Sequence, residues 1–196
     1  MTMIARLATI ISLIFGSSLL AAEPPKAPDA ATVKLLQEFE ASFEAKMKDV
    51  KVDDQFKTIS AELKNLSQNL SDSQLPDVEH YALTKDGEGM RWWLAFFFVE
   101  RGKLDSAAHL FVDALVRKKE NRSYVMWKYW ESCLGERKDF KELSRNFGSA
   151  LVRQFEVGNA EYKQVVAELF GKGETEAKMS VEDFKKAIDF DKTIAK

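Results

Sequence analysis

Three residues whose side chains could bind a metal or move a proton, Asp105, His109 and Asp113, are spaced four apart. On a helix this spacing places them along one face, and both carboxylate and imidazole groups are zinc ligands. The chain has only two histidines, however, and no further ligand follows at a metal-binding spacing. We therefore expect no metal site, and we interpret His109 as a surface residue paired with its acidic neighbours.

Covalent catalysis has little support in the sequence. The chain has one cysteine, Cys133, and no glycine-rich phosphate loop, so no set of nucleophile, base and orienting group can be assembled from recognisable motifs. Cys133 lies in an aromatic-rich segment without an activating neighbour, which favours a buried thiol. We predict that the protein is not an enzyme and uses no cofactor.

All four tryptophans lie between residues 92 and 130. Tryptophan and tyrosine combine a large apolar body with a polar tip, which suits a binding surface. Packed helices also need bulky rings as filler, so we expect core packing for most of these rings and partial exposure for a pair of them. We assign a partner-binding surface to Arg91, Trp92, Lys128 and Tyr129.

The composition is that of a folded protein. Hydrophobic residues make up 45% and charged residues 31%, which excludes a disordered tail, a collagen-like fibre and a disulfide scaffold. A net charge of -2 gives no broad attraction for nucleic acid, and we expect no nucleic-acid partner. The basic run 117–119, together with Arg122, lies between two predicted helices, where cations stabilise a helix C-terminus. We interpret it as a capping group rather than as an anion site.

Residues 1–22 have the features of a secretory signal peptide. Arg6 precedes an apolar stretch over 7–20, and Ala21-Ala22 supply small residues for cleavage. The alternative is an uncleaved membrane anchor, but the apolar run is shorter than the roughly 20 residues of a spanning helix and small polar residues interrupt it. We expect export to a periplasm or the extracellular space, without stable membrane insertion after cleavage.

Apolar residues in the rest of the chain recur at spacings of three and four, which predicts helices and no strand of useful length. Residues 23–31 contain three of the four prolines and are predicted to be an extended tether. Residues 32–83 are predicted to form an N-terminal helical hairpin. Further helices are predicted over 90–99, 104–118, 121–134, 139–155 and 160–170, with a last one opened by a capping box at Ser180.

Three of the later helices share the pattern Phe-x-x-Ala-(Leu/Ile), which begins at Phe111, Phe147 and Phe184. A helix–turn–helix unit that recurs at this interval is typical of a solenoid, in which no unit can bury its apolar face alone.

The stretch from Ala95 to Leu115 resembles one tetratricopeptide repeat, because it has a small and a large residue in the first helix, Gly102 at the turn and Phe111 in the second helix. Units at about 124–157 and 160–192 resemble it loosely; in the first of these, Lys138 stands at the turn-glycine position. The resemblance implies an all-α solenoid of about three helical pairs over 84–196, with a C-terminal capping helix. It also implies that the first helices line a concave groove.

These features predict an exported, noncatalytic binding or scaffolding module whose partner is another protein or a peptide. Self-association through an uncapped end is compatible with so short a solenoid. The alternative is a small helical enzyme or ligand carrier in which the aromatic cluster lines a pocket. An open groove with charged and aromatic side chains would favour the binding module, and a closed apolar cavity with converging polar groups would favour the enzyme or ligand carrier.

Overall fold

A computed structural model of the chain describes residues 27–50, 55–85, 89–118 and 120–188. Within these ranges every regular element is helical and no strand occurs, which confirms the all-α class. The expected signal peptide (1–22) and most of the expected tether lie outside these ranges. In the described part of the chain no helix is both long and apolar enough to cross a bilayer.

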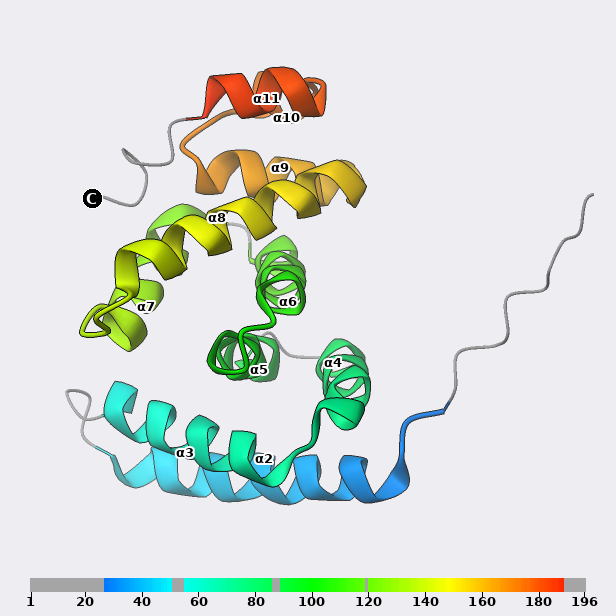
Figure 1. Ribbon diagram of the computed structural model, residues 1–196, viewed down its shortest axis with the longest axis vertical. Coiled ribbons are helices and arrows are strands. Elements are labelled where there is room, and N and C mark those ends of the chain that lie inside the picture. Colours follow the sequence, from blue (N-terminus) through cyan, green and yellow to red (C-terminus); the bar gives the residue numbers. More distant parts are fainter. Residues whose placement is uncertain (1–26, 51–54, 86–88, 119, 189–196) are drawn as a thin grey trace, which may run out of the picture.

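The N-terminal part contains three helices rather than the predicted two. α2 (Ala30–Asp49) and α3 (Gln55–Asn69) run in opposite directions at the base of the molecule (Figure 1). After the short 3-10 helix η2 (Asp72–Gln74), α4 (Leu75–Thr84) begins with Pro76 in its first turn. A proline is tolerated there because the first N–H groups of a helix need no intrahelical partner. α2 begins two residues before the expected start at residue 32, because the Asp29 side chain caps it.

α5 (Gly89–Glu100) and α6 (Leu104–Arg117) form the centre of the molecule and are seen nearly end-on in Figure 1. Most residues of α5 are buried, as its apolar composition predicts, because α3, α4 and α6 all pack against it. Gly102 joins α5 to α6 with a φ of 66°, a left-handed conformation that favours glycine.

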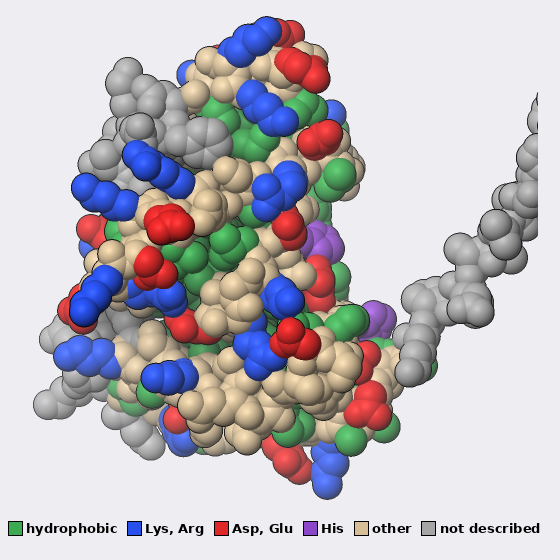
Figure 2. Space-filling view, viewed as in Figure 1, with side chains coloured by type: hydrophobic (Ala, Val, Ile, Leu, Met, Phe, Trp, Pro, Cys, Tyr) green, Lys and Arg blue, Asp and Glu red, His purple; other side chains and the backbone are tan. Residues whose placement is uncertain are grey.

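The remaining helices complete the upper half of the molecule. They are α7 (Arg122–Leu134), α8 (Phe140–Val157), α9 (Ala160–Leu169), the short α10 (Glu174–Ala177) and α11 (Val181–Ala187). The sequence predicted all of these except α10. Ser180 caps α11 as predicted, since its side chain accepts the backbone N–H of Asp183 at 3.2 Å, but the Asp183 carboxylate accepts the Ser180 hydroxyl instead of completing the predicted capping box. Acidic and basic side chains are intermixed over the face seen in Figure 2.

The three phenylalanines of the recurring pattern are all fully buried among other rings. Phe111 and Phe147 lie 5.6 Å apart between ring centroids, and Trp130 stacks on Phe147 at 4.1 Å. Phe184 stacks on Phe155 at 3.9 Å. Aromatic packing therefore joins α6, α7 and α8, and it attaches α11 to α8.

Replacing Phe147 with alanine should lower the free energy of unfolding by about 3–5 kcal/mol, because it leaves a cavity between Trp130 and Phe111. Urea unfolding followed by circular dichroism measures this loss. Tyr124→Ala on α7 is the control: that side chain is 70% exposed, and its loss should change stability by no more than about 0.5 kcal/mol. Equal effects of the two substitutions would contradict the assignment of Phe147 to the core.

Candidate functional site

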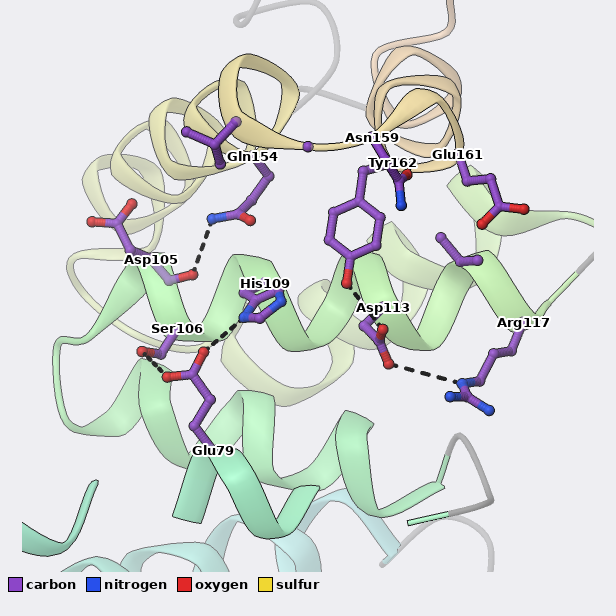
Figure 3. A pocket seen from close by; sticks show the side chains of 13 residues that line it. Glu79, Asp105, Ser106, His109, Asp113, Arg117, Gln154, Asn159, Glu161 and Tyr162 are labelled. Atoms are coloured by element: carbon purple, nitrogen blue, oxygen red, sulfur yellow. Dashed lines mark hydrogen bonds and ion pairs between the residues drawn. The ribbon is translucent and has the colours of Figure 1, made fainter. Parts of the chain in front are cut away.

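An open groove of about 740 Å³ runs along α6 and is the candidate site. One face of α6 forms its floor, and its walls come from α4 and from the junction of α8 with α9 (Figure 3). We call it the α6 groove. Its described lining residues are Glu79, Asp105, Ser106, His109, Asp113, Val116, Arg117, Gln154, Val157, Gly158, Asn159, Glu161 and Tyr162.

A tight turn from α8 into α9 places Tyr162 over the groove. A Cβ atom at Gly158 would lie 2.6 Å from the Cβ of Tyr162 and 2.5 Å from the backbone oxygen of Gln154, so only glycine fits this approach. Asn159 then caps α9, its side-chain oxygen accepting the N–H of Tyr162 at 2.9 Å. The ring of Tyr162 is thereby held opposite α6.

At one end of the groove, Glu79 binds two side chains of α6. Its carboxylate lies 2.8 Å from Nδ1 of His109 and accepts the hydroxyl of Ser106 at 2.9 Å. These hydrogen bonds, that of His109 foremost, lower the pKa of Glu79 despite its partial burial. The expected pairing of His109 with its neighbours along the helix is wrong, because its partner comes from α4.

At the other end, the carboxylate of Asp113 on α6 contacts three side chains. Its Oδ1 accepts the hydroxyl of Tyr162 at 2.9 Å, and its Oδ2 lies 2.5 Å from Nε of the buried Arg91 and 3.8 Å from Nε of Arg117. Burial, together with the hydrogen bond to the Asp113 carboxylate, raises the pKa of Tyr162. The phenol therefore stays protonated and acts as a donor.

The four residues that the sequence assigned to a binding surface lie outside this groove. Arg91 is fully buried and Trp92 is 7% exposed, because α3, α4 and α6 cover α5. Neither side chain is therefore at the surface, which corrects the expectation for both. Lys128 is exposed on α7, and Tyr129 is half-buried against the rings of Trp92 and Trp93.

The aromatic cluster is mainly core, as expected. Trp92 and Trp130 are buried, whereas Trp93 and Trp127 are partly exposed. The capping role expected of Arg122 is confirmed: its Nε donates to the backbone oxygens of Leu115 at 2.8 Å and Lys118 at 2.5 Å, at the end of α6.

Three residues of the groove floor were noted from the sequence but were assigned no binding role, and the walls were not identified from it. The spacing of Asp105, His109 and Asp113 marked one face of α6 as chemically distinct. Glu79 and Tyr162 come from segments about 30 and 50 residues away from the floor residues that they bind. No spacing pattern in the sequence could have joined them to α6, because only the packing of α4 and α9 does so.

The groove lacks the relay that nucleophilic catalysis needs. Ser106 and His109 both bond to Glu79 rather than to each other, so the imidazole does not activate the hydroxyl. Elsewhere, burial raises the pKa of Cys133 to about 12, which leaves the thiol protonated and unreactive. Within the described ranges, no group of three or more His, Cys, Asp or Glu side chains could hold a metal ion.

No protein-family model, no curated protein and no solved structure matches this chain. The functional interpretation therefore depends on the geometry of the groove itself.

Arg91→Met should lower the free energy of unfolding by about 3 kcal/mol or more, because it leaves the Asp113 charge without its buried partner. Arg117→Met is the matched control, since Arg117 approaches the same carboxylate but its side chain is 48% exposed. Its loss should cost less than about 1 kcal/mol. Urea unfolding of both variants makes the comparison, and equal losses would argue against a special role for the buried guanidinium.

Glu79→Gln should destabilise the protein near neutral pH more than in acid. Because the pKa of Glu79 is lowered from its ordinary value of 4.5, its ionised form stabilises the fold above that value, and this contribution disappears as the pH falls through the lowered pKa. The difference in unfolding free energy between wild type and variant should shrink by about 1 kcal/mol between about pH 7 and about pH 3. A difference that stays constant over this range would contradict the assigned hydrogen bonds.

Proposed function

We propose that the protein is an exported, noncatalytic binding module and that the α6 groove holds a segment of another protein. The main support for this proposal is that the open groove contains both polar side chains held by hydrogen bonds and a polar side chain without a partner among the described residues. Glu79 and Asp113 are held by hydrogen bonds from other helices, whereas Glu161 is exposed and has no hydrogen-bond or ion-pair partner among the described residues. Val157 adds an apolar contact at the rim, since it is 77% exposed.

Several features favour binding over catalysis. The groove is open to solvent, so it does not exclude water from a reacting group. The raised pKa of Tyr162 and the lowered pKa of Glu79 make both side chains poor proton-transfer groups near neutral pH. The alternative of an enzyme or carrier with an aromatic pocket has less support, because the tryptophan rings pack on other rings and none of them is among the described lining residues of the groove.

We propose that α5–α6, α7–α8 and α9–α11 are three degenerate tetratricopeptide-like units that follow the N-terminal helices. The burial of Phe111, Phe147 and Phe184, and the left-handed Gly102 between α5 and α6, support this assignment. The second helices also lie against one another, since α6 contacts α8 and α8 contacts α11. In this scheme the floor of the groove is the second helix α6 and part of its wall is the first helix α9, whereas Arg91, Trp92, Lys128 and Tyr129 belong to the first helices α5 and α7.

The two possible docking faces can be separated by affinity capture from a cell-envelope extract. The double variant Val157→Lys/Glu161→Lys changes exposed residues at the groove, and Tyr124→Glu/Lys128→Glu changes exposed residues of α7. We expect wild type and the α7 variant to retain the same partner protein in mass spectrometry, and the groove variant to lose at least about 90% of it, since like charges and lost contacts at a rim weaken docking.

Circular dichroism and thermal unfolding should first show that both double variants fold as wild type does. If the groove variant keeps the partner and the α7 variant loses it, the proposed site is overturned and the binding surface is on α7.

A further inference from the structure

We infer that the partner presents an arginine side chain to the α6 groove, between His109 on α6 and the first turn of α9. This inference rests on the proposed binding function of the groove.

The first step is the orientation of His109. Ser106 and His109 bond to opposite oxygens of Glu79, so the carboxylate is fixed and Nδ1 of the imidazole carries the proton that it shares with Glu79. In the neutral ring Nε2 is then an acceptor, and no described group of the protein bonds to it. Figure 3 shows the ring between the side chains of Glu79 and Tyr162, on the face of α6 that forms the floor.

The second step is the balance of acceptors and donors along the groove, on either side of His109 (Figure 3). Asp105 lies one turn before His109 and uses only Oδ1 in its ion pair with Arg153, and Glu161 has no hydrogen-bond or ion-pair partner among the described residues. Arg117, the cationic side chain of the groove lining, is directed toward Asp113 (Figure 3). The available groups are therefore mainly acceptors, and a guanidinium with its five N–H donors complements them best.

The third step is the pair of rings beside these acceptors. The centroids of His109 and Tyr162 are 5.9 Å apart, with an angle of 50° between the ring planes. A planar guanidinium stacks on such faces, whereas a lysine ammonium is a compact and strongly hydrated charge. The rings therefore favour arginine over lysine, and the acceptors favour either cation over a neutral side chain.

Titration of the ¹⁵N-labelled full-length chain with short peptides, followed by NMR, tests the inference. The probes are acetyl-Gly-Arg-Gly-amide and the same peptide with lysine or with citrulline, which keeps the shape of arginine but not its charge. We expect the arginine peptide to shift the amide signals of α6 and of residues 158–162, with lysine weaker and citrulline weaker by at least about tenfold, or about 1.4 kcal/mol. Lysine that binds as tightly as arginine would overturn the guanidinium preference.

The role of His109 is tested with two variants at about pH 7.5. His109→Gln keeps one amide donor for Glu79 and one acceptor for the groove, whereas His109→Phe keeps a ring but has no acceptor. The glutamine variant should bind the arginine peptide within about threefold of wild type, and the phenylalanine variant should bind it at least about tenfold more weakly, with circular dichroism showing that both fold as wild type does. A phenylalanine variant that binds like wild type would overturn the assignment of the acceptor to His109.

The failures of the two proposals can be told apart. If arginine and citrulline peptides bind the groove equally well, the arginine inference is overturned while binding in the groove stands. If no peptide shifts the groove signals, the arginine inference is also overturned, and the binding function is then decided by whether the groove double variant loses its captured partner.

Discussion

The arrangement of the central helices depends on the buried guanidinium of Arg91. A buried charge is tolerated only when its partners satisfy it, and here they come from two other helices. Arg91 donates to the backbone oxygens of Leu83 at 2.6 Å and Lys85 at 2.5 Å, at the end of α4, and pairs with Asp113 of α6. Because Asp113 also accepts from Tyr162 of α9, one network fixes α4, α5, α6 and α9. Three of these helices line the α6 groove, so the network around Arg91 and Asp113 positions both the core helices and the walls of the groove.

The helices could be predicted from the sequence because their determinants are local. Apolar periodicity placed most of them, Gly102 marked the turn after α5, and Ser180 marked the start of α11. α4 was not predicted as a separate helix, because residues 32–83 were predicted to form a hairpin of two helices, and a proline can either end a helix or, as Pro76 does in the structure, lie in the first turn of a new one. The same residue type is compatible with either role, and the choice depends on the packing of α4 against α2, α5 and α6.

The site was harder to predict because its chemistry is assembled by tertiary contacts. Arg91 was assigned to the surface because a charged residue beside tryptophans suggests an interface, yet the free carbonyls at the end of α4 and the Asp113 carboxylate allow full burial. His109 was expected to pair with the acidic residues along α6, but its hydrogen-bond partner is Glu79 of α4, which could not be inferred from spacing. The spacing of polar residues therefore marked one face of α6 as polar. The side chains that bind to this face, Glu79 and Tyr162, became known only from the packing of α4 and α9.

Arginine recurs as a cap for the ends of helices in this protein, which has only nine glycines and four prolines to end them. Arg101 donates to the backbone oxygens of Ser67 and Leu70 at the end of α3, Arg91 to those at the end of α4, and Arg122 to those at the end of α6. Each guanidinium meets carbonyls in the last turn of a helix or just beyond it, at the negative end of the helix dipole. Arginine side chains that bind these carbonyls point into the fold rather than into solvent. The guanidinium of Arg91 thus reaches Asp113 from the buried side, and acceptors on the solvent side of the α6 groove remain available to a partner.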